Sequence, residues 1–231
     1  CPVEIGWDAA LPPQLALLPL ASRLDPRPLD EWRREADAWT CIDIDPADAA
    51  RSAETLLELT RTRALPLDEA RALGLLRGES PLDVPPLLTE GLVEVPAWRH
   101  ARLNYPHPLL ERGLSVLDTP GLNAIGAEPE LTLSLLPAAH AVVFLLAADS
   151  GVTRSDLAIW RDHLGGMAGG SRGGSGGSSG GAAAASLRFV VLNKIDALID
   201  PLATPEQVQA QIESQRRETA RTLNVPAQRV F

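Results

Sequence analysis

Two short polar motifs in the sequence each follow an apolar run, and each contains an aspartate. The first motif, DTPG, occupies residues 118–121 and follows the apolar residues 114–117. The second motif, NKID, occupies residues 193–196 and follows the apolar residues 187–192. Short apolar runs of this kind are typical of buried strands. Because ligands of doubly wound sheets bind beyond the carboxyl ends of the strands, the spacing predicts that both motifs lie at a ligand-binding edge.

The DTPG motif has residue types that suit a nucleotide and its metal ion. The Asp118 carboxylate can reach the Mg²⁺ of a bound nucleotide through a water molecule. Gly121 lets the backbone approach a γ-phosphate and offer its N–H group. Loss of that phosphate would release the following loop, as in a switch. We include Thr119 and Pro120 in the predicted nucleotide-binding site, although a strand that simply ends in a Pro-Gly turn has the same sequence.

The NKID motif has residue types that can read guanine. The Asp196 carboxylate can accept both N1–H and the 2-amino group of guanine, whereas adenine would leave the carboxylate unpaired. Lys194 can lay its aliphatic stem along the base, and Asn193 can brace the surrounding loops with its amide. Lys194 is also the single lysine of the chain. An exposed Asn-Lys turn is the alternative interpretation, and it does not explain the position of that lysine.

The elements around the motifs alternate between strands and helices. Residues 141–146 are an unbroken apolar run typical of a central parallel strand. We expect helices over residues 128–139, from Thr153, and from Thr204, where the last two positions start with capping-box sequences. This alternation predicts a three-layer α/β fold with a mostly parallel sheet and right-handed crossovers.

The first half of the chain gives weaker patterns. We expect residues 3–7 to form a strand paired with residues 15–20, and further strands within residues 92–103. Residues 29–38 and 47–62 have helical patterns. In the second half, residues 165–185 are rich in glycine, serine and alanine, which predicts a flexible loop inside a single domain of residues 1–231.

Composition excludes several functions. The chain has 231 residues and a formal charge of −9, which argues against nucleic acid as a partner. Cys1 and Cys41 are too few for a disulfide framework and indicate a reducing, cytoplasmic compartment. No apolar run approaches the roughly 20 residues that span a bilayer. The four histidines have no metal-ligand spacing, and we expect them at the surface or hydrogen-bonded in the core: His100, His107, His140 and His163.

Both ends of the sequence suggest an internal fragment. The chain begins with Cys1, its only methionine is Met167, and residues 229–231 have the pattern of a strand that is just starting. The sequence contains no GxxxxGK[ST] loop, which would supply most phosphate contacts. We therefore expect a G domain that is incomplete at both ends and that does not hydrolyse nucleotide by itself.

The motifs resemble those of bacterial dynamin-like GTPases. DTPG looks like the third GTPase motif, and NKID looks like the fourth. Residues 114–122, 141–149 and 151–156 are similar to that family's run from switch II into the next helix, and residues 1–4 resemble the stretch just after switch I. The resemblance implies a P-loop NTPase-type G domain, GTP and Mg²⁺ as cofactors, and GTP hydrolysis. It also implies self-assembly and membrane remodelling at the inner face of the membrane, through regions outside these residues.

Two alternatives share the motifs. An Era-like ribosome-associated GTPase would place the third motif soon after switch I, whereas here 117 residues precede Asp118 without the first motif. A non-hydrolysing scaffold or interaction module on the same fold is the other alternative, because fold alone does not imply catalysis.

Overall fold

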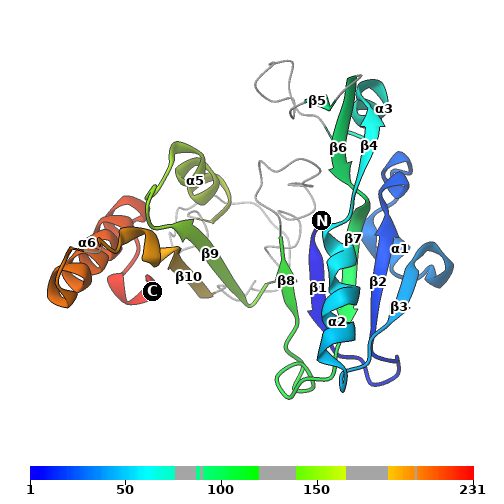
Figure 1. Ribbon diagram of the computed structural model, residues 1–231, viewed down its shortest axis with the longest axis horizontal. Coiled ribbons are helices and arrows are strands. Elements are labelled where there is room, and N and C mark those ends of the chain that lie inside the picture. The colour runs from blue at the N-terminus through cyan, green and yellow to red at the C-terminus, as the bar shows by residue number, and fades with distance from the viewer. Residues whose placement is uncertain (76–86, 89–90, 120–138, 165–186, 201) are drawn as a thin grey trace, which may run out of the picture. The chain divides into compact units, whose positions relative to one another are not determined.

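The computed structural model describes residues 1–75, 87–88, 91–119, 139–164, 187–200 and 202–231 (Figure 1). It has a mixed α/β structure whose contacts divide into two compact units, Cys1–Pro129 and Glu130–Phe231. Residues 128–138 of the predicted helix over residues 128–139, and the glycine-rich residues 165–185, lie outside the described residues.

The first unit is built around a five-stranded sheet with the order β3-β2-β7-β1-β8. Its strands are β1 (Val3–Gly6), β2 (Gln14–Pro19), β3 (Thr40–Asp43), β7 (Trp98–Asn104) and β8 (Val116–Asp118). Only the β1–β7 pair is parallel, while the pairs β1–β8, β2–β3 and β2–β7 are antiparallel. The expectation of a mostly parallel sheet is therefore wrong for this unit.

The predicted pairing of residues 3–7 with residues 15–20 is also wrong. Both segments do form strands, but β7 lies between them and pairs with each. Strand β7 has seven residues whose side chains alternate between the two faces of the sheet. Its backbone forms hydrogen bonds with both β1 and β2. The pairing is set by this long-range partner rather than by closeness in sequence.

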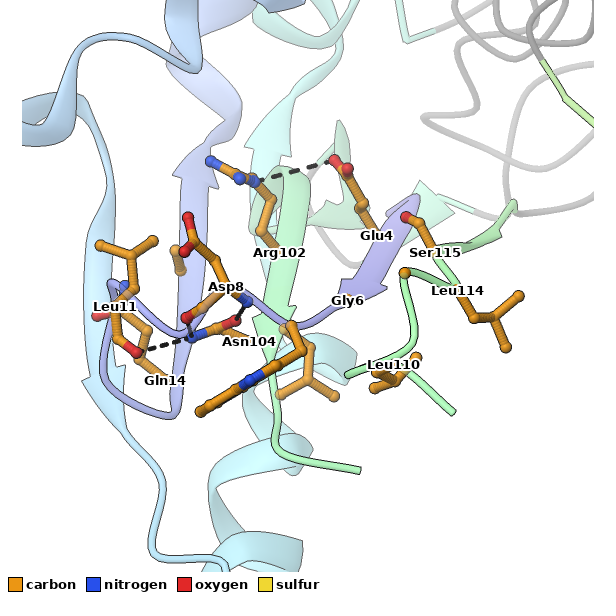
Figure 2. A pocket seen from close by; sticks show the side chains of 14 residues that line it. Glu4, Gly6, Asp8, Leu11, Gln14, Arg102, Asn104, Leu110, Leu114 and Ser115 are labelled. Carbon is orange, nitrogen blue, oxygen red and sulfur yellow. Dashed lines mark hydrogen bonds and ion pairs between the residues drawn. The ribbon is translucent and has the colours of Figure 1, made fainter. Parts of the chain in front are cut away.

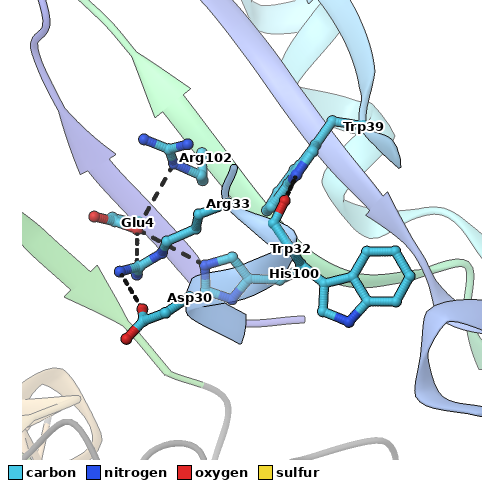
Figure 3. Close-up of polar contacts among 7 residues, drawn as sticks. All are labelled: Glu4, Asp30, Trp32, Arg33, Trp39, His100 and Arg102. Atoms are coloured by element: carbon cyan, nitrogen blue, oxygen red, sulfur yellow. Dashed lines mark hydrogen bonds and ion pairs between the residues drawn. The ribbon is translucent and has the colours of Figure 1, made fainter. Parts of the chain in front are cut away.

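The two faces of the five-stranded sheet differ in chemistry. One face is an apolar core that α2 (Ala49–Leu56) covers in Figure 1, and its buried members are Val3, Leu15, Leu17, Ile44 and Ala101. The opposite face carries Glu4, Ala16 and Arg102, which the strand register places side by side. One end of this polar face has a hollow (Figure 2), and the other end lies beneath α1 (Leu29–Trp32) (Figure 3).

The helices of the first unit are shorter than their sequence patterns predict. The pattern over residues 29–38 yields only α1 and the 3₁₀ turn Ala36–Ala38, and Trp39 Nε1 donates a hydrogen bond to the Trp32 carbonyl at the end of α1. The pattern over residues 47–62 yields α2 and the 3₁₀ turn Leu57–Thr60. A 3₁₀ turn Leu20–Leu24 follows β2.

A smaller antiparallel sheet completes the first unit. Its strands are β4 (Thr62–Pro66), β5 (Leu87–Leu88) and β6 (Leu92–Pro96), in the order β4-β6-β5. Helix α3 (Leu67–Ala72) follows β4 directly, and its Ala70 packs with Leu65, Val93 and Val95 in a separate apolar cluster.

The second unit contains a parallel strand pair with helices. Strands β9 (Ala141–Ala147) and β10 (Leu187–Asn193) pair in register along seven residues, as the apolar runs predict. A parallel bridge between Val190 and Val230 lies beside β10, so the strand pattern predicted for residues 229–231 is present from Val230, while Arg229 belongs to a 3₁₀ turn. The helical elements are α5 (Arg154–Ile159), the π-helical turn Trp160–Leu164, the 3₁₀ turns Ile195–Leu198 and Ala227–Arg229, and α6 (Pro205–Leu223).

Local capping chemistry fixes where the helices of the second unit begin. Thr153 and Asp156 form a complete capping box at α5, and Thr204 and Gln207 form another at α6, both as predicted. The buried Trp160 joins these elements, because its Nε1 donates a hydrogen bond to the Leu223 carbonyl at the end of α6.

Candidate functional site

The NKID motif lies where the two parallel strands of the second unit end together. The register pairs Asn193 with Ala147, the last residue of β9. The backbone N–H of Ala148 donates a hydrogen bond of 2.9 Å to the Asn193 carbonyl. The loop after β9 and the loop after β10 are therefore joined at one carboxyl edge, the kind of edge where doubly wound sheets bind ligands.

The backbone turns sharply inside the NKID motif. Lys194 has φ of 57° and ψ of 39°, a left-handed conformation that is uncommon for a residue with a side chain. The Asn193 side-chain oxygen accepts a hydrogen bond of 2.9 Å from the Lys194 N–H and so stabilises the turn. Asp196 then lies in the first turn of the 3₁₀ helix Ile195–Leu198.

The side chains of this loop are available to a ligand. Asn193, Lys194 and Asp196 are all exposed. Within the described part of the chain, the Lys194 ammonium and the Asp196 carboxylate have no hydrogen-bond or ion-pair partner. A carboxylate with both oxygens free can accept two parallel N–H groups, and a neighbouring lysine stem can cover an aromatic ring.

The described part of the DTPG motif lies in the first unit. Asp118 is the last residue of β8 and pairs across the strands with Val3. Its side chain is exposed, and Thr119 is half-buried just after the strand. Pro120 and Gly121 lie outside the described residues, so their contact with the γ-phosphate stays a prediction. The described residues contain no group of three or more His, Cys, Asp and Glu side chains placed to hold a metal ion.

A cluster of charged residues on the polar face of the first unit was not predicted from the sequence (Figure 3). Glu4 Oε2 accepts a hydrogen bond of 2.7 Å from Arg33 Nη2, and Arg102 Nε lies 3.9 Å from the same oxygen. Asp30 Oδ1 accepts a second bond of 3.2 Å from Arg33 Nη1. The cluster joins residues from β1, β7 and α1, which are far apart in the sequence. The alternating polar residues of β7 were therefore the only local sequence pattern that indicated this cluster.

His100 completes this cluster and departs from the sequence expectation. It is fully buried, and neither ring nitrogen has a hydrogen-bond partner among the described residues. Its Nε2 is 4.0 Å from Glu4 Oε2, which is too long for a direct hydrogen bond. The His100 imidazole, and then the charges of Arg33 and Arg102, hold the pKa of Glu4 below its usual value against the opposing effect of burial.

Comparison with known proteins gives one similarity in sequence. No model of a protein family matches the chain. A stretch of 67 residues is 31% identical to a bacterial dynamin-like protein of Nostoc punctiforme. The chain has weak homology to that dynamin-like protein. The stretch makes up 29% of this chain and 10% of the relative, so the chain matches only a small part of it.

Two solved structures also align with the chain. Both are described as an oligomerised bacterial dynamin pair that provides a mechanism for the long-range sensing and tethering of membranes. They align with 100% and 99% of the chain at 10% and 11% identity, each with a TM-score of 0.42. The chain spans 27% of each of these solved chains. Among the described residues, no helix is long and apolar enough to cross a membrane.

Proposed function

We propose that this chain is part of the GTP-binding domain of a dynamin-like GTPase and carries the residues that recognise guanine. The observation that supports the proposal most directly is the NKID loop at the shared edge of β9 and β10, with Lys194 and Asp196 exposed and unpaired among the described residues. The sequence similarity to a bacterial dynamin-like protein points to the same class.

The guanine specificity follows from hydrogen-bond complementarity. The Asp196 carboxylate accepts the N1–H and the 2-amino group of guanine in a bidentate pair. Adenine offers no such pair of donors, and ATP would leave the carboxylate desolvated without a partner. A site built to bond a particular donor rejects the analogue without it by a factor on the order of 10⁴.

We assign binding of the nucleotide phosphates to the DTPG motif and to residues outside this chain. Asp118 would hold the Mg²⁺ of the nucleotide, and its single exposed carboxylate suits an ion that keeps most of its own waters. We assign Thr119, Pro120 and Gly121 to the same proposed nucleotide site, where Gly121 would offer its N–H to the γ-phosphate. These 231 residues contain no GxxxxGK[ST] sequence, and we propose that residues outside them supply the phosphate-binding loop and that the chain alone is inactive. Bound Mg²⁺ would offset charge on the phosphates during attack by water.

The cellular role follows the dynamin-like class. We infer that the protein assembles with copies of itself and contacts membranes through regions outside these residues, from the cytoplasmic side. No observation on the chain favours the ribosome-associated or scaffold alternatives over this assignment.

Nucleotide hydrolysis by a longer protein that contains this chain tests the proposal. We expect that protein to hydrolyse GTP and to leave ATP essentially intact, and we expect Asp196→Ala to abolish the preference. Asp162→Ala is the matched control, because Asp162 is another exposed aspartate of the second unit away from the NKID loop. Equal hydrolysis of GTP and ATP by the unaltered protein would contradict the proposal.

A further inference from the structure

The hollow on the polar face of the first unit has the features of a small binding site. It encloses about 230 Å³ between the end of β1, the loop that follows it and the segment before β8 (Figure 2). It lies at the opposite end of β8 from Asp118, because Ser115 lines it and β8 runs from Val116 to Asp118. Three residues of strand separate the two positions by about 10 Å.

One wall of the hollow is fixed by the Asn104 side chain. Its Nδ2 donates to the carbonyls of Asp8, Leu11 and Pro12 at 2.9 to 3.1 Å, and its Oδ1 accepts from the Asp8 N–H at 2.7 Å. Asp8 in turn accepts a hydrogen bond from the Ala10 N–H at 2.9 Å. A single side chain thus holds the loop after β1 in one shape, which preorganises the hollow.

The Arg102 guanidinium is a charged group of the hollow with free donors. Its Nε faces Glu4 at 3.9 Å, and its guanidinium carbon lies 5.9 Å from the centre of the Trp39 ring. Among the described residues, its two terminal nitrogens have no hydrogen-bond partner. Because Arg33 already binds Glu4 at 2.7 Å, the Glu4 charge is shared and does not cancel that of Arg102.

Neutral donors and an apolar surface complete the lining. The Gln14 amide and the Ser115 hydroxyl both line the hollow, and neither has a side-chain hydrogen bond within the described residues. Trp7 and Leu114 add apolar surface beside them. Apolar walls with a few convergent polar groups are typical of small-molecule sites.

We propose that this hollow binds a small molecule that carries one carboxylate on a short apolar body. The fork of Arg102 nitrogens matches a carboxylate, and Gln14 of the neighbouring strand β2 can donate to one of its oxygens. The apolar body would lie on Trp7 and Leu114. Asp8 and Glu4 nearby disfavour ligands with several negative charges, so the site differs in chemistry from a phosphate site. The proposal is independent of nucleotide binding.

Titration of the isotope-labelled chain with 4-methylpentanoate, followed by amide chemical shifts, tests this proposal. The amides of Gly6 and Gly113, which line the hollow, should shift and saturate with a Kd on the order of 1 mM. The neutral isostere 4-methylpentanamide and inorganic phosphate should each bind at least about tenfold more weakly, because they lack the single planar carboxylate.

Variants separate the proposed site from general binding. Arg102→Gln should weaken 4-methylpentanoate about tenfold or more, and Gln14→Leu should weaken it by a smaller factor. Arg61→Gln is the matched control, since Arg61 is an exposed arginine of the same unit that does not line the hollow. Dispersed spectra of each variant will show that the unit remains folded. Absence of saturable shifts in the unaltered chain, or equal affinity in Arg102→Gln, would overturn the proposal.

Discussion

Removing the Glu4 charge should destabilise the first unit by an amount that depends on pH. Glu4 is 26% exposed and its main partner Arg33 is 28% exposed, so solvent screens their 2.7 Å contact only in part. Hydrogen bonds to charged groups stabilise proteins by about 1.5–3 kcal/mol, and the amide in Glu4→Gln retains a weaker acceptor. We therefore expect a loss of about 1.5 kcal/mol at neutral pH. With a urea dependence of about 1–3 kcal/mol per molar, the midpoint should fall by roughly 1 M.

The pH dependence follows from the lowered pKa of Glu4. A carboxyl whose pKa is lower in the folded state contributes stability above its usual pKa of 4.5, and this stability is lost as the pH falls through the folded-state value. The difference in stability between the unaltered chain and Glu4→Gln should therefore be largest at neutral pH and shrink on acidification. The glutamine variant cannot lose this contribution, because it does not titrate.

Urea denaturation followed by tryptophan fluorescence measures both effects, since Trp32 and Trp39 flank the cluster. Asp30→Asn is the matched control: Asp30 contacts the same Arg33 at 3.2 Å but is 76% exposed, so its loss should cost less than about 0.5 kcal/mol. The reasoning is refuted if Glu4→Gln and Asp30→Asn are equally stable at neutral pH. It is also refuted if the effect of Glu4→Gln is constant between neutral pH and about pH 3.

Two further predictions concern the second unit. Trp160→Phe removes the buried 3.0 Å hydrogen bond to the Leu223 carbonyl, which should cost about 1–3 kcal/mol in urea denaturation monitored by circular dichroism; an unchanged midpoint would show that the carbonyl finds another partner. Gly151→Ala should destabilise the loop after β9 by about 1–2 kcal/mol, because Gly151 has φ of 63° and an added Cβ would lie 3.0 Å from Gln215 Nε2. Adding Gln215→Ala should recover only the part of the lost stability that comes from the steric contact. The measurement is amide hydrogen exchange, which should be faster around the loop in Gly151→Ala than in the unaltered chain.

Much of the second unit could be predicted from the sequence because its signals are local. The apolar runs predicted strands over residues 141–146 and 187–192, and the structure extends each by one residue. The helix starts at Thr153 and Thr204 were also predictable, since a capping box involves only residues three apart. The placement of the NKID loop at a strand end follows from these local signals.

The first unit could be predicted only in part because its order depends on distant contacts. Strands β1 and β2 pair with β7, which lies about 80 or more residues further along the chain, and no local pattern encodes that choice. Trp98 Nε1 donates to the Glu58 carbonyl across 40 residues, at the 3₁₀ turn where the predicted helix of residues 47–62 has already ended. The charged cluster was missed for the same reason, since Glu4, Arg33 and His100 come from three separate elements.

The base preference of Asp196→Asn tests the central claim most directly. In a longer protein that contains this chain, the asparagine amide offers a donor where xanthine has a carbonyl, whereas guanine presents only donors there. We predict that the variant loses affinity for GTP by a factor of about 10² or more and gains affinity for xanthosine triphosphate. Unchanged GTP selectivity in a competition assay would contradict the assignment of Asp196 as the residue that reads guanine.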